Sequence, residues 1–290
     1  MKKGLWLVLA ALMVLGVLAG CSGVQNTQSA APETSTALRI VSTVPSATEV
    51  LFALGVGDWI VGVDVSSTYP EAANGIEKVG DYNGFDIEKI VALDPDVVFA
   101  GNKLQADLVK QLTDAGLNVV EADPTLYEDI APSITLIGEA VGRQEEAAAL
   151  NEQIAAAAQA VTEKAAAFTD KPTIYYVMGL GEYGNWTSGE GSFINTVMEM
   201  CGATCVTAGS ASPWMDYPVE DLVTDDPDIL IVSNWVTEEQ LKTEVGYADL
   251  TAVAQGHYYF ITPDIVERPG PRIIEALQAI QDDILNYLGE

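Results

Sequence analysis

Runs of apolar residues with the composition of β-strands alternate with helical patterns along most of the chain. After the first run, Ser46-Ala47-Thr48-Glu49 matches the capping-box pattern of a helix start, and the apolar helix is expected to stop near Gly55. Strands that alternate with helices indicate an α/β fold with a mainly parallel sheet. In the first half of the chain, strands are predicted at residues 38–42, 59–63, 96–100 and 117–120.

One long segment breaks this alternation. Residues 143–168 contain no Gly or Pro and many alanines, and alanine has the highest helix propensity. A continuous helix of this length would span about 39 Å. The segment lacks clean heptads, which disfavours a coiled coil. Lys171-Pro172 ends the helix, and a second α/β half follows. The expected domains are an α/β lobe at 38–142, a connecting helix at 143–170 and a second α/β lobe at 171–290.

Residues 86–102 and 218–234 resemble each other, and they align without a gap at a constant offset of 132 positions. Each segment predicts a short helix with an acidic start, an Asp-Pro-Asp turn and a buried strand that ends in asparagine, at Asn102 and at Asn234. A repeat at this distance indicates two similar lobes rather than a solenoid. Glu88 and Glu220 occupy matched positions at the two helix starts. Pairing with the helix dipole would explain either one alone, whereas their symmetry indicates two anionic points on one body.

The chain opens with an export signal. Lys2 and Lys3 precede an apolar run that is too short for a membrane span and suits the core of a secretory signal. Leu-Ala-Gly before Cys21 is similar to the lipobox of bacterial lipoproteins, in which the cysteine is acylated. We expect a lipoprotein signal peptide at 1–20, then a lipidated cysteine and flexible tether at 21–37. An ordinary signal peptide or an uncleaved anchor is the alternative.

Composition narrows the classes of function. With 13 Lys+Arg against 42 Asp+Glu, the net charge of −29 argues against a nucleic-acid binder and against a basic membrane-binding face. One histidine and three cysteines argue against an all-protein zinc site, so we expect neither a metal site nor a permanent cofactor. The G-x-G-x-x-G sequence at 179–184 is not followed at once by a helix, as a dinucleotide fingerprint requires. Cys201 and Cys205 are compatible with a disulfide or with two free thiols.

Several aromatic residues fall at predicted loops. Aromatic side chains at strand ends, facing each other across two lobes, would form a flat-faced clamp for a large planar or bulky ligand. An enzyme would need a nucleophile and a base, and His257 lies in a predicted strand without a nucleophile motif nearby. The aromatic residues at these loops are Tyr82, Tyr183, Trp186, Trp214, Tyr217 and Trp235.

Four stretches together resemble the ABC-transporter substrate-binding proteins of the cobalamin and iron-siderophore class. They lie at residues 40–49, 79–88, 187–200 and 267–272, in the order expected for that class. The resemblance implies two Rossmann-like α/β lobes joined by one long rigid helix, with little hinge motion and a ligand cleft between the lobes. It also implies that Glu88 and Glu220 dock on permease arginines. The candidate ligand-binding residues are Pro45, Tyr82, Asn102, Trp186, Trp214, Asn234, Trp235 and Arg268.

The resemblance implies an extracytoplasmic, lipid-anchored periplasmic binding protein that delivers a ligand to an ABC permease dimer and its ATPase. Among ligands, we favour cobalamin or a related corrinoid, because ferric siderophores call for several cationic groups and only Arg268 and Arg272 lie near the expected cleft. A ferric siderophore or haem is the alternative within the class. An exported two-lobed hydrolase or a solute sensor is the alternative outside it. We expect a monomer that contacts the membrane only through its lipid and binds no nucleic acid.

Overall fold

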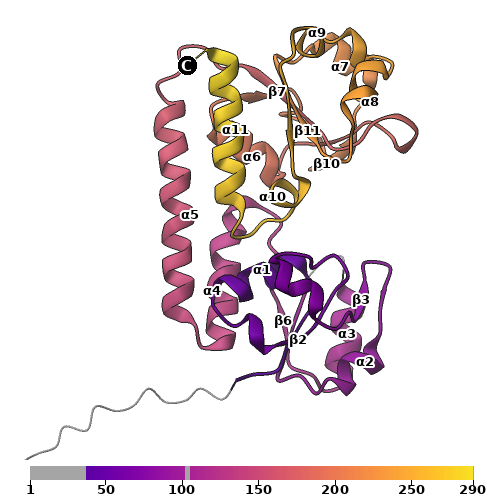
Figure 1. Cartoon of the computed structure of the whole chain (residues 1–290), viewed down its shortest axis with the longest axis vertical. Coiled ribbons are helices and arrows are strands. Elements are labelled where there is room, and N and C mark those ends of the chain that lie inside the picture. Colours follow the sequence, from indigo (N-terminus) through magenta and orange to yellow (C-terminus); the bar gives the residue numbers. More distant parts are fainter. Residues whose placement is uncertain (1–36, 102–104, 290) are drawn as a thin grey trace, which may run out of the picture. The chain divides into compact units, whose positions relative to one another are not determined.

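In the computed structural model, which describes residues 37–101 and 105–289, two four-stranded parallel sheets form the framework (Figure 1). All the described residues belong to one compact unit, residues 37–290. The first sheet has the order β2-β1-β5-β6 and the second the order β12-β11-β7-β9, with every neighbouring pair parallel. The predicted α/β fold class is therefore confirmed. The strands are β1 Ile40–Ser42, β2 Ile60–Val63, β5 Val97–Ala100, β6 Val119–Glu121, β7 Thr173–Val177, β9 Thr204–Cys205, β11 Ile229–Ser233 and β12 Tyr258–Ile261.

The two sheets share one topology. In chain order, each sheet places its second strand at one edge, followed by its first, third and fourth strands. The register agrees as well, because Ile40 of β1 pairs with Val97, and Ile174 of β7 pairs with Ile229, the residue that matches Val97 in the repeat. The two repeated segments therefore fold alike. We call residues 38–142 the N-terminal lobe and residues 171–290 the C-terminal lobe.

The two Asp-Pro-Asp turns, which connect the repeated helices to the repeated strands, have similar backbone angles. Helix α2 (Ile87–Ala92) leads to Asp94 with φ 48°, and helix α7 (Val219–Asp225) leads to Asp226 with φ 36°. Left-handed backbone is uncommon for any residue except glycine, and Asp tolerates it better than most. The Asp-Pro-Asp sequence thus encodes the same sharp turn in both lobes.

The long helix α5 (Gln144–Ala165) packs against α4 (Ile130–Val141) and α11 (Ile273–Leu288). Its buried positions are spaced three, four or seven residues apart, which places them on one face of the helix. The Gln281 amide of α11 donates a buried hydrogen bond to the Val161 carbonyl at 2.7 Å. One continuous hydrophobic core includes residues of both sheets and of α5. The buried residues of α5 are Ala147, Ile154, Ala158, Val161 and Ala165.

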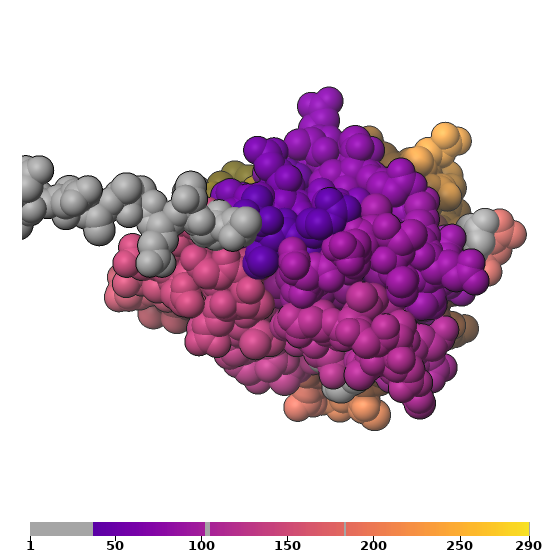
Figure 2. All heavy atoms as spheres, turned by 90° about the horizontal axis from the view of Figure 1, so that it is seen from below, coloured from indigo at the N-terminus to yellow at the C-terminus, as the bar shows by residue number. Residues whose placement is uncertain are grey.

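Shorter helices complete the two lobes. Seen from below, residues of the N-terminal lobe, coloured from indigo to magenta, cover most of the surface in view (Figure 2). The remaining α-helices are α1 Pro45–Ala53, α3 Ala106–Asp114, α6 Phe193–Met200, α8 Glu238–Thr243, α9 Thr251–Gln255 and α10 Pro263–Glu267. Single 3₁₀ turns are η1 Gly57–Trp59, η2 Glu71–Gly75, η3 Tyr127–Asp129, η4 Gly181–Tyr183 and η5 Tyr247–Asp249.

The predicted capping box at the start of α1 is wrong. Val44 occupies the N-cap position without a side-chain cap, and Pro45 is the first helical residue. Proline presets the φ angle of a first turn, so the helix begins one residue before the serine. The Ser46 hydroxyl is buried without a hydrogen-bond partner, and the Glu49 carboxylate binds Arg272 instead of the helix start. Tertiary contacts therefore override the local pattern.

Both described cysteines are free and buried. Cys201 lies at the end of α6 and its thiol contacts the Leu277 carbonyl at 3.3 Å, while the Cys205 thiol contacts the Asn195 carbonyl at 3.7 Å. Burial raises the pKa of Cys201 to about 12 and also raises the pKa of Cys205. Of the two states that the sequence allows, the structure has the pair of thiols.

Candidate ligand-binding site

A pocket of about 190 Å³ opens at the carboxyl ends of the N-terminal strands. In parallel α/β sheets this edge is the usual place for a ligand. Two predicted ligand residues, Pro45 and Tyr82, lie in its wall. The described residues that line it are Thr43, Val44, Pro45, Asp64, Ser66, Tyr82, Phe85, Gln105 and Asp123.

The polar wall of this pocket consists of carboxyl groups and a side-chain amide. Gln105 ties the wall together, because its amide donates to the Thr43 carbonyl at 2.9 Å and accepts from the Gly101 N–H at 2.8 Å. The buried Asp64 carboxylate accepts from the Ser67 hydroxyl and from the Ser66 N–H. Burial raises the pKa of both Asp64 and Asp123. The described lining residues thus supply carboxyl and amide oxygens that can accept hydrogen bonds from a ligand.

Tyr82 stands at the tip of a two-stranded hairpin beside this pocket. Strands β3 (Gly80–Asp81) and β4 (Gly84–Phe85) pair antiparallel, and the Asp81 carboxylate accepts from the Asn83 N–H at 2.8 Å across the turn. Gly80 has φ 140°, and a Cβ there would lie 2.5 Å from the Gly84 carbonyl oxygen. The tight hairpin leaves the Tyr82 side chain 76% exposed, which makes it available to a ligand.

The C-terminal lobe carries a second aromatic surface on an antiparallel ribbon. Strand β8 (Trp186–Ser188) pairs with β10 (Trp214–Asp216), with Trp186 opposite Asp216 and Trp214 opposite Ser188. Residues two apart on a strand share a face, so Trp186 and Trp214 lie on the same face as diagonal neighbours. The two indoles are 43% and 36% exposed, and Phe193 supports Trp214 edge-on at 6.5 Å.

Asn185 anchors this ribbon to the lobe. Its side-chain oxygen accepts from the Tyr175 hydroxyl at 3.3 Å and from the Tyr247 hydroxyl, and its amide donates to the Tyr217 carbonyl at 2.7 Å. Its backbone N–H donates to the Asp216 carboxylate at 2.6 Å. Burial raises the pKa of Tyr175 and Tyr247, so both hydroxyls remain protonated donors. The position of Trp186 is thus fixed by its neighbour in sequence.

Both arginines near the expected cleft are paired with carboxylates. Arg272 binds Glu49 of α1 in a bidentate manner, with Nε–Oε2 at 2.8 Å and Nη2–Oε1 at 2.5 Å. Arg268 pairs with Asp264 at 2.8 Å and reaches Glu49 at 3.4 Å. The Arg272 guanidinium also stacks on the Tyr69 ring, 4.1 Å from its centroid. Two positive charges thus meet two negative charges, and the ion pairs connect the N-terminal lobe to the C-terminal lobe.

The structure groups some of the predicted site residues and leaves others apart. Pro45 and Tyr82 share the N-terminal pocket, Trp186 and Trp214 share the ribbon, and Arg268 joins the ion pairs between the lobes. Asn234 and Trp235 follow β11 as exposed residues, and Trp235 is 73% exposed. Glu88 and Glu220 are exposed in the first turns of α2 and α7. Asn102 and Cys21 lie outside the described residues, as do the predicted signal peptide and residues 21–36 of the tether.

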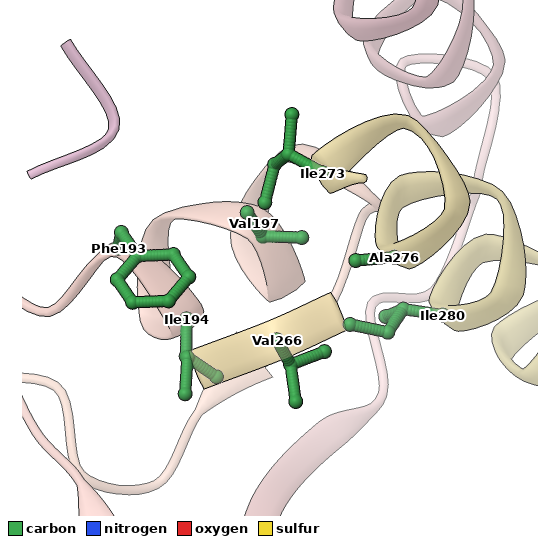
Figure 3. Close-up of a pocket in the computed structure, with 7 residues that line it drawn as sticks. All are labelled: Phe193, Ile194, Val197, Val266, Ile273, Ala276 and Ile280. Atoms are coloured by element: carbon green, nitrogen blue, oxygen red, sulfur yellow. The ribbon is translucent and has the colours of Figure 1, made fainter. Parts of the chain in front are cut away.

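Two further hollows do not involve the predicted residues. An apolar cavity among α6, α10 and α11 has no room for a water molecule, and its side chains point toward one another within the core (Figure 3). A groove of about 340 Å³ lies beside the ion pairs and takes residues from α1, α5 and α11. Among the described residues, no three His, Cys, Asp or Glu side chains are placed to hold a metal ion.

Residues 40–265 match the family model described as periplasmic binding protein. The chain belongs to the periplasmic binding protein family. Members of this family bind substrates for transporters and are not enzymes, so the protein is a substrate-binding protein of an ABC importer.

Three known proteins illustrate the similarity. The ABC transporter substrate-binding lipoprotein YvrC of Bacillus subtilis is 31% identical over 85% of this chain and 79% of its own length. The vitamin B12-binding protein of Photorhabdus laumondii is 27% identical over 95% of this chain and 96% of its own. The haem-binding protein RhuT of Roseiflexus has a solved structure with a TM-score of 0.78 and 24% identity, covering 87% of this chain and 99% of its own.

Proposed function

We propose that this binding protein captures cobalamin or a related corrinoid outside the cytoplasm and delivers it to its permease. The observation that carries this choice is the pairing of Arg268 and Arg272 with Glu49 and Asp264. An anionic ferric chelate calls for cationic groups that are free to bind it, and here both guanidinium groups are already neutralised. The periphery of a corrinoid is rich in uncharged amides, which donate hydrogen bonds to acceptors.

The walls described above suit such a ligand. In the N-terminal pocket, Asp64 offers an acceptor to amide donors, and the Gln105 side chain carries both a donor and an acceptor. Exposed aromatic faces at Tyr82 and on the Trp186–Trp214 ribbon offer flat apolar surface to a bulky macrocycle. Relatives named vitamin B12-binding proteins support the same assignment. Because haem-binding proteins share this fold, haem is included as a competing ligand in the experiment below.

Calorimetry on residues 22–290 tests the ligand. We expect one cobalamin to bind per chain, more tightly than haem or any ferric siderophore in a panel. Trp186→Ala and Trp214→Ala should each weaken cobalamin binding by about 1–3 kcal/mol, as expected for aromatic anchors. Phe260→Ala is the matched control, because this residue is an exposed aromatic outside the proposed site. Tighter binding of haem or a siderophore would overturn the corrinoid assignment and leave the importer role in place.

Glu88 and Glu220 are the proposed docking points for the permease dimer. They occupy equivalent first-turn positions of α2 and α7, so one glutamate per lobe matches one arginine cluster per permease subunit. Glu88→Arg with Glu220→Arg should abolish uptake and preserve both ligand affinity and melting temperature. Glu145→Arg with Glu239→Arg makes the same charge change at exposed first-turn positions of α5 and α8 and should leave uptake normal. Normal transport by the folded Glu88/Glu220 variant would contradict the docking role.

A lipid on Cys21 is the proposed anchor. Among the described residues, no helix is both long and apolar enough to cross a membrane. The lipobox-like Leu-Ala-Gly-Cys sequence and the lipoprotein YvrC among the relatives support acylation. Cys21→Ser should move the protein from the membrane fraction to the soluble fraction. Unchanged fractionation of this variant would remove the anchor from the proposal.

A further inference from the structure

Two exposed valines occupy the same position in the two repeated helices. Val91 of α2 is 42% exposed and Val223 of α7 is 39% exposed, and they are 132 residues apart like the rest of the repeat. The preceding residues, Ile90 and Leu222, are fully buried and attach each helix to its lobe. The valines are therefore not the residues that hold these helices in place.

The two helices have kept only some of their solvent-facing residues alike. The exposed Ala92 corresponds to Thr224, so this position has diverged between the lobes. The exposed glutamates and the exposed valines are identical in both. A β-branched residue lowers helix propensity slightly, and each of these valines keeps 39–42% of its surface exposed, so packing within the chain uses only part of the side chain. Its retention at both matched sites, beside a matched glutamate, indicates a shared contact with something outside the chain.

Each valine lies beside its glutamate on the helix surface. Residues three apart on a helix are neighbours, with Cβ atoms about 5–6 Å apart. Glu88 with Val91 and Glu220 with Val223 thus form one composite patch per lobe. In Figure 1, α2 and α7 lie toward the side of the body away from α5. The nearest cation, Lys89, is engaged with Glu77 and with the Lys78 carbonyl, and Asp221 adds negative charge next to Glu220.

From this arrangement we infer that Val91 and Val223 are the apolar half of the docking surface. The partner is the permease dimer, and it would present on each subunit an apolar side chain flanked by basic groups. The inference rests on the proposed docking role of Glu88 and Glu220. The charged half orients the complex and speeds encounter, while the apolar half adds affinity that salt does not screen. The repeat fits the twofold symmetry of a permease dimer, so both patches bind equivalent surfaces.

Binding of the full chain to purified permease–ATPase complex in nanodiscs tests the inference. Val91→Asn with Val223→Asn should raise the docking Kd about tenfold or more, with ligand affinity and melting temperature unchanged. The ratio of variant to wild-type Kd should stay constant between about 0.05 and 0.5 M salt. For Glu88→Gln with Glu220→Gln, the same ratio should shrink as salt screens the charges.

The matched control is Leu136→Asn with Phe260→Asn, which removes one exposed apolar side chain from each lobe away from α2 and α7, and it should dock normally. Val91→Thr with Val223→Thr keeps the side-chain shape and serves as a second variant if the asparagines destabilise the helices. Normal docking of the valine variants alongside weakened docking of the glutamate variants would overturn this inference and leave the docking role intact. Normal docking of both sets would overturn both.

Discussion

The two lobes share a framework and differ at their proposed ligand-binding faces. Both place four parallel strands in the same order and both turn sharply at an Asp with positive φ. In the N-terminal lobe, the proposed ligand face consists of strand ends and the short Tyr82 hairpin. The C-terminal lobe adds the β8–β10 ribbon, with β8 between β7 and α6 and β10 between β9 and α7, and two tryptophans lie on that ribbon. The repeat thus specifies the scaffold, whereas the hairpin, the ribbon and the strand-end loops make the two lobes different.

The largest effect is expected where the lobes are joined. Glu49→Ala leaves Arg272 as a buried charge without its bidentate partner and should lower the free energy of unfolding by about 3–5 kcal/mol. Urea unfolding followed by tryptophan fluorescence measures this loss. Glu77→Ala removes an exposed partner of Lys89 and should cost at most about 1 kcal/mol. Similar small losses for both variants would show that the lobes do not depend on this ion pair.

A smaller effect distinguishes the ribbon from the hairpin. Asn185→Ala removes the acceptor of two buried tyrosine hydroxyls and should lower the free energy of unfolding by about 1–3 kcal/mol. It should also weaken ligand binding, because Trp186 follows Asn185 directly. Asp81→Ala removes one hydrogen bond from the exposed hairpin and should cost about 1 kcal/mol or less. Thermal unfolding and calorimetry on both variants test this contrast, and unchanged affinity for Asn185→Ala would contradict it.

The smallest expected changes in the free energy of unfolding have opposite signs at Asp94 and Asp226, which are equivalent positions of the repeat. Glycine adopts positive φ without strain, so Asp94→Gly should stabilise the protein by up to about 1 kcal/mol. Asp226 has the same backbone conformation, but its carboxylate accepts from the Thr251 N–H at 2.8 Å and from the Thr251 hydroxyl at 2.6 Å. Asp226→Gly should therefore destabilise by about 1 kcal/mol. Urea unfolding of both variants, compared at equal m-value, measures the change in the free energy of unfolding. A change of the same sign in both variants would contradict this prediction.

Local sequence patterns were sufficient to predict much of the α/β framework. Alanine content and the absence of Gly and Pro predicted α5 to within a few residues, because such a segment needs no partner to favour a helix. The offset of 132 predicted two lobes of similar structure before any strand order was known. Strand composition located the N-terminal strands to within two residues.

The pairings around the site could not be predicted in the same way. Glu49 and Arg272 are separated by more than two hundred residues, and only the fold brings them together. Ser46 and Glu49 matched a local capping pattern, yet the glutamate serves a contact between lobes. The spacing of Asp264 and Arg268 at four residues on a helix was a usable signal for an ion pair. Asn185 gave no such signal, because both tyrosines that bind its side chain come from distant segments.

The burial of Cys201 and Cys205 has a practical consequence for labelling. A thiol reacts as its thiolate, and burial raises the pKa of Cys201 to about 12 and that of Cys205 as well. The fragment of residues 22–290 that is proposed for calorimetry contains only these two cysteines. A new cysteine on the surface would then be the one site open to a maleimide dye at neutral pH. Ala92→Cys or Thr224→Cys would place such a dye on α2 or on α7, and its fluorescence would test the proposed contact with the permease one lobe at a time.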